Sequence, residues 1–161
     1  MELPTGRKKL QGIVLAKGNP AARLEELANS GFTGYVPLTI LGNSGIEEGS
    51  IIFKSGKIRG ANFLYPAFGK EFYGTEALKQ CFNALAAKKG IFEAIELSEQ
   101  QVELTLALKE ELSVEGVKAS DFKKIIPAGY SKEFSEKVSK EFAGKESKAE
   151  LFKKLGFAGL E

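Results

Sequence analysis

The chain has 161 residues, of which 43% are hydrophobic and 27% are charged, a composition typical of a folded globular protein and not of a disordered one. Its 23 basic and 21 acidic side chains give a formal net charge of +2, so no strong overall field would draw it to nucleic acid or to an anionic membrane. It has no histidine and one cysteine, which excludes histidine-based catalysis, His-ligated metals, an intrachain disulfide and a cysteine zinc site.

The charged side chains are mostly lysine and glutamate, and cysteine and methionine occur once each. This profile is typical of proteins from hot environments, so we expect a thermophilic source. No apolar run reaches the roughly 18 residues that suggest a membrane span, and the basic N-terminal stretch is followed by an apolar run too short for a signal peptide. We therefore expect a cytoplasmic protein.

The first part of the chain predicts a strand, a helix and a second strand. A short strand is expected over residues 12–16, and Asn19 followed by Pro20 is typical of a helix start. Residues 32–41 then alternate as a strand does, but they include Pro37, which cannot donate a hydrogen bond to a neighbouring strand. This second strand is therefore expected at a sheet edge or with a bulge.

Residues 46–63, IEEGSIIFKSGKIRGANF, predict a β-hairpin with Ser55–Gly56 as its two-residue turn. The simplest register gives three directly opposed pairs: Lys54 with Lys57, Phe53 with Ile58, and Ile52 with Arg59. Two opposed lysines are unfavourable by less than about 1 kcal/mol, and an anionic partner would offset that cost.

Alternation of side chains divides the hairpin into two faces. The face expected to point into the core holds Ile51, Phe53, Ile58 and Gly60. The opposite face holds Ile52, Lys54, Lys57, Arg59, Ala61 and Phe63. Its three cations, with Phe63 among them and Tyr65 close by, are similar to sheet surfaces that contact phosphates and stack bases. Solvent, a protein partner and nucleic acid are the three alternatives for what covers this face.

An aromatic segment, LYPAFGKEFYG, connects the hairpin to the next helix. Its Phe68, Phe72 and Tyr73 either cover one end of the sheet or contact a ligand or partner. The helix that follows places Cys81 within an apolar stripe, which indicates a buried cysteine and not a reactive thiol. A final strand is expected over residues 91–97.

Residues 98–112, SEQQVELTLALKEEL, carry two conflicting signals. Their apolar residues alternate as in a strand, whereas Ser98 with Gln101 three residues later forms a capping box that predicts a helix. We expect the helix. Because apolar side chains would then lie on both sides of it, we expect burial between layers or against another chain, including a second copy in a homodimer.

Beyond residue 112 the hydrophobic pattern weakens. We expect a linker over 113–130 and short amphipathic helices over 131–161, which dock on the rest of the chain in preference to a partner. Residues 1–112 are expected to form one α+β domain, with a mostly antiparallel sheet of about five strands packed against helices.

The sequence offers no catalytic constellation. None of its Gly-Lys pairs is followed by Ser or Thr, so it has no P-loop. Paired glutamates occur at Glu47/Glu48, Glu93/Glu96 and Glu110/Glu111, and their charged surroundings indicate solvated surface. We expect neither enzyme activity nor a cofactor nor a metal.

Several short stretches together resemble a known family. SGFTGYVPL, GSIIFKSGKIRGA, GTEAL and KKGIFE follow one another as in PATAN-type domains, named for the N-terminal region of a cyanobacterial patterning regulator, and as in related archaeal proteins of unknown function. The resemblance spans residues 24–97 and rests on Gly31, Gly34, Gly49, Phe53, Gly56, Ile58, Ala61, Gly74, Ala77, Leu78, Gly90 and Phe92. It implies an α+β domain that is attached to prokaryotic regulatory proteins and mediates interactions, with no catalytic residues to transfer.

We therefore predict a non-catalytic protein-interaction module with a regulatory or adaptor role in a prokaryotic, archaeal cell. Its candidate interaction surface comprises Lys54, Lys57, Arg59, Phe68, Phe72 and Tyr73. The partner is expected to be a protein, with homodimerisation through residues 98–112 as one case and without membrane association. The alternative is a protein that binds nucleic acid or another anion through the basic hairpin face, which the small net charge disfavours.

Overall fold

The computed structural model describes residues 2–154, with the backbone alone for Gly116 and for 146–154. The strands are β1 (Arg7–Val14), β2 (Gly34–Gly42), β3 (Gly45–Lys54), β4 (Lys57–Tyr65), β5 (Lys70–Tyr73), β6 (Gly90–Glu96) and β7 (Ser113–Val117). The helices are α1 (Leu15–Gly18), α2 (Pro20–Asn29), α3 (Gly74–Leu85), α4 (Glu99–Leu108), α5 (Phe122–Ile125) and α6 (Glu133–Lys154). Short 3-10 turns are η1 (Pro66–Phe68), η2 (Glu110–Leu112) and η3 (Ala119–Asp121).

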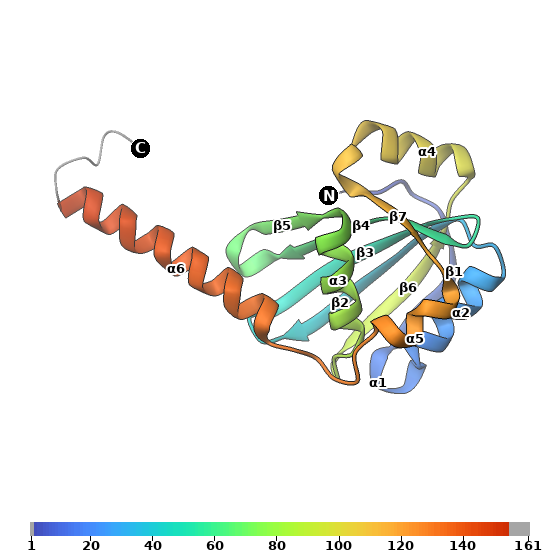
Figure 1. The fold of residues 1–161 in the computed structure, drawn as a ribbon, viewed down its shortest axis with the longest axis horizontal. Helices are drawn as coiled ribbons and strands as arrows, with labels where there is room; N and C mark the ends of the chain where they lie inside the picture. The colour runs from blue at the N-terminus through green and yellow to red at the C-terminus, as the bar shows by residue number, and fades with distance from the viewer. Residues whose placement is uncertain (1, 155–161) are drawn as a thin grey trace.

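The strands form one antiparallel sheet in the order β1-β6-β2-β3-β4-β5, and β7 pairs with the part of β4 that β5 leaves free (Figure 1). The predicted α+β class and antiparallel sheet are confirmed. Within the described residues the sheet has seven strands, more than predicted, because the aromatic segment contributes β5 and the residues after 112 contribute β7.

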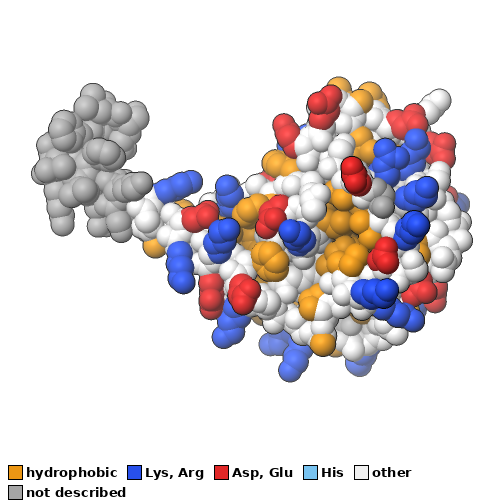
Figure 2. All heavy atoms as spheres, in the orientation of Figure 1, with side chains coloured by type: hydrophobic (Ala, Val, Ile, Leu, Met, Phe, Trp, Pro, Cys, Tyr) orange, Lys and Arg blue, Asp and Glu red, His pale blue; other side chains and the backbone are white. Residues whose placement is uncertain are grey.

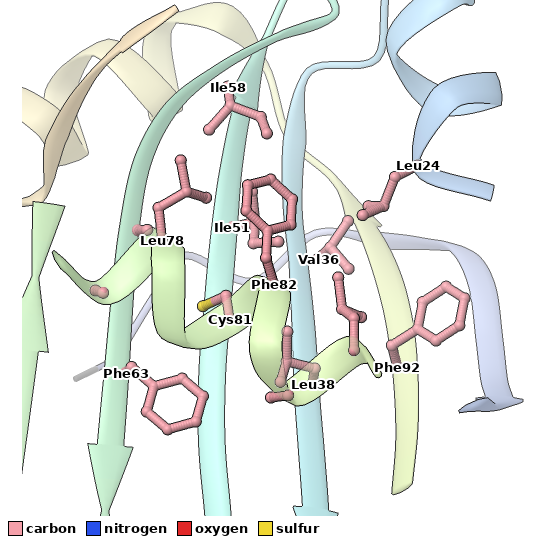
Figure 3. Close-up of a cluster of buried hydrophobic side chains, with 14 of the residues drawn as sticks. Leu24, Val36, Leu38, Ile51, Ile58, Phe63, Leu78, Cys81, Phe82 and Phe92 are labelled. Atoms are coloured by element: carbon pink, nitrogen blue, oxygen red, sulfur yellow. The ribbon is translucent and has the colours of Figure 1, made fainter. Parts of the chain in front are cut away.

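The main core lies on the sheet face that α2, α3 and α5 cover (Figure 3). Leu24 of α2 and Phe82 of α3 are buried there against strand residues such as Ile51. Each such side chain stabilises the fold by about 1.5–3 kcal/mol through removal from water. Cys81 is also buried, as predicted, and burial raises the pKa of its thiol, so the thiolate is suppressed.

A smaller cluster lies on the opposite sheet face, beneath α4. Ile52 of β3 packs there with Leu97, Val102 of α4 and Leu112. Because one end of β3 and β4 is therefore covered on both sides, α4 forms a third layer over that end alone (Figure 1).

The start of the chain differs in part from expectation. Asn19 caps α2 as predicted, its side chain accepting a hydrogen bond from the Ala22 backbone N–H at 3.4 Å. The prediction of a first strand over 12–16 is wrong, since β1 begins at Arg7 and ends at Val14. The earlier start is favoured by pairing with β6, where Arg7 contacts Glu96 at 3.0 Å.

The placement predicted for Pro37 is wrong. Its strand, β2, lies inside the sheet between β6 and β3, and the register of β2 against β6 is the same before and after the proline. The β2–β6 ladder simply omits positions 36 and 37. Because Pro37 has no N–H group, the β2–β6 ladder is interrupted there, yet β2 remains an interior strand of the sheet.

The hairpin prediction is confirmed at its turn and corrected beyond it. Lys54 opposes Lys57 and Phe53 opposes Ile58 as expected, but Ile52 opposes Gly60, so Arg59 is an extra residue in a bulge. One extra residue exchanges the two faces of the strand that follows. Gly60 consequently lies on the α4 side, while Ala61 and Phe63 lie in the main core, the reverse of the prediction.

The segment 113–130, expected as a linker, is part of the domain. β7 pairs with β4 at Ile58 and Gly60. Phe122 is 0% exposed, and its ring lies 6.4 Å from that of Phe53 and 6.2 Å from that of Phe82. The segment therefore completes both the sheet and the core.

The C-terminal helices predicted over 131–161 are one continuous helix, α6, as far as the described residues extend; residues 155–161 lie outside them. Asn83 fixes the approach to α6, because its side chain accepts from the Ser131 N–H at 2.8 Å and donates to the Ser131 carbonyl at 3.0 Å. Val138 is buried and the Phe142 ring lies 5.3 Å from that of Phe68, so the first turns dock on the domain. The helix then projects away from it (Figure 1).

If residues 113–126 belong to the core, Phe122→Ala must create a cavity. We expect the free energy of unfolding to fall by about 3–5 kcal/mol, measured by urea denaturation followed by circular dichroism. Phe142→Ala, which truncates a ring on the partly exposed side of α6, serves as the control and should change stability less. A Phe122→Ala loss below about 1 kcal/mol would contradict this packing.

Candidate interaction site

The β3–β4 turn has the geometry that its sequence predicts. Ser55 and Gly56 both have positive φ, at 49° and 79°, as a tight two-residue hairpin turn requires. Gly56 is also required by close packing, since a Cβ there would lie 2.1 Å from the Ala28 carbonyl oxygen. The turn is therefore fixed against α2 on one side.

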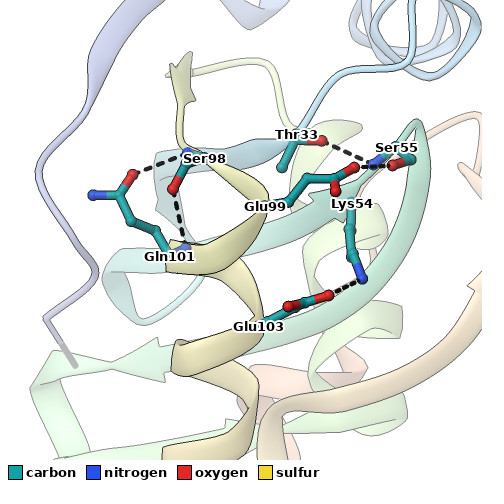
Figure 4. A network of polar contacts seen from close by, with 7 residues as sticks. All are labelled: Thr33, Lys54, Ser55, Ser98, Glu99, Gln101 and Glu103. Carbon is teal, nitrogen blue, oxygen red and sulfur yellow. Dashed lines mark hydrogen bonds and ion pairs between the residues drawn. The ribbon is translucent and has the colours of Figure 1, made fainter.

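A polar network fixes the same turn against α4 (Figure 4). The Ser55 hydroxyl donates to Glu99 Oε1 at 2.7 Å, and Lys54 Nζ lies 2.5 Å from Glu103 Oε1. The capping box of Ser98 and Gln101 is present, which confirms the helix predicted over this segment. The N-terminal half of α4 is thus attached to the hairpin.

Lys54 is engaged inside the molecule and does not belong to a free cationic surface. Its hydrogen bond to Glu103, and then its positive charge, lower the pKa of that carboxyl, and Arg59 adds a weaker effect of the same sign. The anionic group that offsets the opposed Lys54 and Lys57 is therefore Glu103 of the chain itself.

Lys57 and Arg59 line an open groove of about 520 Å³ between β4 and β7. The other lining residues are Ser113, Val114, Glu115 and Lys118. Within the described part of the chain, the side chains of Lys57, Arg59 and Lys118 form neither a hydrogen bond nor an ion pair. Figure 2 shows Lys and Arg side chains over the region of β7 and α5, with Asp and Glu side chains among them. We call this site the basic groove.

The three aromatic candidates are used within the fold. The Phe72 ring packs on the Tyr65 ring at a centroid distance of 5.9 Å, and the Phe68 ring packs on α6. Lys109 Nζ lies 4.2 Å from the centre of the Tyr73 ring and donates a hydrogen bond to the Tyr73 hydroxyl. They lie at the C-terminal end of β4, whereas Lys57 lies at its start. The structure therefore does not bring the six predicted residues together.

The aromatic rings expected to stack bases are not available for stacking. Phe63 and Tyr65 are each 1% exposed, and the Tyr65 hydroxyl donates to Gln80 Oε1 at 2.6 Å. Their inward orientation follows from the bulge at Arg59, which reverses the faces of β4. The basic groove consequently has cations without accompanying aromatic rings.

The outer side of α4 exposes two leucines among polar residues such as Gln101. Leu104 and Leu108, one helical turn apart, are 60% and 79% exposed, while Val102 and Leu106 face the second cluster. Both exposed leucines line a groove of about 500 Å³ with the N-terminal segment, which contributes Leu3 and Pro4. We call this site the α4 surface. In the sequence, this surface was indicated by the apolar residues on both sides of the helix predicted over residues 98–112.

A second exposed apolar surface lies on the sheet face opposite α3, at the end that α4 leaves open. Leu41 pairs there with Ile46, and Ile91 with Val14. Thr39 pairs with Ile91 and precedes Leu41 by two positions, which places all of these side chains on one face. Leu41 and Ile46 are 56% and 54% exposed.

The carboxylate of Glu47 was predicted to be solvated, which is wrong: Glu47 is 1% exposed. The Tyr130 hydroxyl donates to Glu47 Oε2 at 2.8 Å and accepts from the Asn43 N–H at 3.2 Å, and the backbone of Asn43 and Ser44 also acts on the Glu47 carboxyl. Burial raises the Glu47 pKa, and these hydrogen bonds oppose the rise in part. Every one of these groups belongs to the chain itself, so Glu47 connects the β2–β3 turn to the segment before α6.

The fold and these surfaces define a small α+β domain with an apolar helix face and a basic groove. Among the side chains that the structure describes, no group of three metal-binding residues occurs. Residues 1–109 match the model of a family described as "Uncharacterized protein conserved in archaea (DUF2226)", and the chain belongs to this family. This match confirms the resemblance to archaeal proteins of unknown function.

No curated protein and no solved structure matches the chain. In the described residues, no helix combines the length and the apolar character that crossing a membrane requires.

Glu47 predicts a specific pH dependence of stability. Because its pKa is higher in the folded than in the unfolded chain, its contribution is most favourable at pH values below the unfolded pKa. This contribution falls as the pH rises through the interval up to the folded pKa. We expect Glu47→Gln to remove that part of the fall when urea midpoints are measured from acidic to neutral pH. Glu48→Gln, at an exposed neighbour, should leave the profile unchanged; parallel profiles for wild type and Glu47→Gln would contradict the prediction.

Proposed function

We propose that the protein is a non-catalytic protein-interaction module with a regulatory or adaptor role, and that the α4 surface is its docking site. The single observation that carries this proposal is the exposure of Leu104 and Leu108, 60% and 79%, on a helix whose other side is already packed. Transfer of one such leucine from water to an apolar interface is favourable by about 1.5–3 kcal/mol. Two of them beside an apolar groove therefore favour association.

A second copy of the chain is the partner that we propose for this surface. In a dimer with twofold symmetry the same patch from both copies meets, so one apolar helix face is sufficient to form a self-complementary contact. The groove with Leu3 and Pro4 extends the patch beyond the helix. Aliphatic residues at the centre of a patch and polar groups around it are the usual composition of such interfaces.

Kinship with PATAN-type domains is part of the same proposal. The resemblance supports a regulatory role, because those domains are attached to prokaryotic regulatory proteins. The Lys- and Glu-rich composition supports a thermophilic source, and the N-terminal sequence supports a cytoplasmic location.

The second candidate function is binding of nucleic acid or another anion in the basic groove. It is favoured by one observation, the three groove cations that have no ion-pair partner among the described residues. A labelled single-stranded oligonucleotide tests the nucleic-acid form. Affinity that does not change with salt, or that survives Lys57→Glu with Arg59→Glu, would exclude it.

The docking proposal predicts concentration-dependent self-association. Light scattering should give a mass that rises toward that of a dimer, and Leu104→Glu with Leu108→Glu should keep the chain monomeric. The matched control is Leu41→Glu with Ile46→Glu, which places the same charges on the other exposed apolar surface and should leave the dimer intact. A wild-type chain that remains a monomer up to about 1 mM, or equal dissociation by both variants, would contradict the proposal.

A further inference from the structure

We propose that the basic groove binds an extended acidic peptide segment of a partner protein. The peptide adds a strand to the free edge of β7, with its carboxylates directed toward Lys57, Arg59 and Lys118. This inference rests on the proposed function as an interaction module and assigns it a second surface with a defined class of partner.

The positive charge of the basic groove favours a ligand with negatively charged groups. Three cations and one carboxylate, Glu115, line a single open volume of about 520 Å³, and the charge of Arg59 also acts on the carboxyl of Glu103, which is already bonded to Lys54. Lys8 and Lys123 pair with Glu93 and Glu25, whereas the three groove cations, like Lys88 and Lys89, form no ion pair in the described residues; what distinguishes the three is that they line one groove. Charges within about 10 Å of one another act together at ordinary ionic strength, so a ligand with several negative groups gains most.

The backbone of β7 selects a peptide over a small anion. β7 is five residues long and pairs with β4, and its other edge pairs with no strand in the part of the chain that is described. An open strand edge presents unpaired N–H and C=O groups and is a template for strand addition. A free phosphate would use only the cations of the groove, while an acidic peptide in extended form would use these cations and also the strand edge of β7 that faces away from β4.

The spacing of strands makes the two contacts compatible. A strand added to β7 would lie two strand spacings from β4, about 10 Å. Lys57 and Arg59 extend from β4 with long side chains, and a glutamate of the peptide extends toward them, so the gap can be bridged. Lys118 follows β7 directly in the chain and lines the same groove.

Nucleic acid fits the groove less well. Sheet surfaces that bind single strands combine cations with aromatic rings on which the bases stack. The nearest aromatic rings of β4, Phe63 and Tyr65, are buried on the other face. A peptide has no need of these rings.

The test uses the whole chain and a fluorescein-labelled peptide of alternating Glu and Val, titrated by anisotropy at low and at physiological ionic strength. We expect saturable, salt-sensitive binding, with slower amide hydrogen exchange at residues 113–118 in the complex. Lys57→Glu with Arg59→Glu should weaken binding about tenfold or more, because like charges then face each other. Lys88→Glu with Lys89→Glu makes the same charge change at exposed lysines of a separate groove and should leave binding unchanged.

Four further probes make the outcome decisive. A peptide with Gln in place of Glu tests charge, and one with Pro in place of Val tests backbone pairing; both should bind about tenfold more weakly or worse. Equal affinity for the Pro peptide, full competition by inorganic triphosphate, or tighter binding of an oligo-dT strand would overturn the peptide proposal. So would the absence of binding to the acidic peptide, or equal weakening by the Lys88 and Lys89 control. Single Lys118→Glu provides a milder variant if the double one unfolds.

Failure of this inference is distinguishable from failure of the docking proposal. Peptide binding depends on Lys57 and Arg59 and is insensitive to Leu104→Glu with Leu108→Glu, whereas self-association has the opposite dependence. Each pair of variants therefore reports on one surface.

Discussion

The extra residue at Arg59 in the β3–β4 ladder determines how the rest of the molecule is arranged. It reverses the faces of β4 after the turn, so Ala61, Phe63 and Tyr65 enter the main core beneath α3. Gly60 then faces the other side, where a Cβ would lie 3.0 Å from Leu106 and 3.1 Å from the Leu112 carbonyl oxygen. A side chain at this position would require these neighbours to shift by a few tenths of an ångström, so glycine favours the close approach of the α4 segment to β4. One inserted residue thus produces a three-layer arrangement at one end of the sheet.

The same hairpin separates two kinds of surface. Lys54 is drawn toward α4 by Glu103, and the helix that it helps to position exposes two leucines on its outer side. Arg59 and Lys57 remain next to β7 without such a partner in the described residues. The sequence predicts that Lys54, Lys57 and Arg59 share one cationic face. In the structure Lys54 bonds to Glu103, while Lys57 and Arg59 line the basic groove. The hairpin therefore contributes to two different surfaces, the α4 surface and the basic groove.

Local signals could be read from the sequence and non-local ones could not. The turn at Ser55–Gly56, the cap at Asn19 and the capping box at Ser98 depend on residues within a few positions of one another, and the structure contains all three. β7 depends on β4, more than fifty positions away, and nothing in its own short, irregular pattern indicates a strand.

The corrected positions have a common physical cause, which is a partner distant in the chain. Glu47 has the composition of a surface residue but is buried because Tyr130, 83 positions later, supplies a hydrogen bond. Pro37 lies inside the sheet because β6 tolerates two missing ladder positions there. The candidate site was predictable only in part for the same reason. The sequence indicated Lys57 and Arg59 as its cations, but it did not predict β7, the strand that forms the groove with them.

The two hydrogen bonds between Asn83 and Ser131 have a mechanical consequence for α6. They hold the chain immediately before the helix on α3, so the direction in which the helix leaves the domain is set at its root and not by its far end. A helix of 22 residues rises about 33 Å. α6 therefore carries its outer turns away from the sheet and from the helices that cover it (Figure 1).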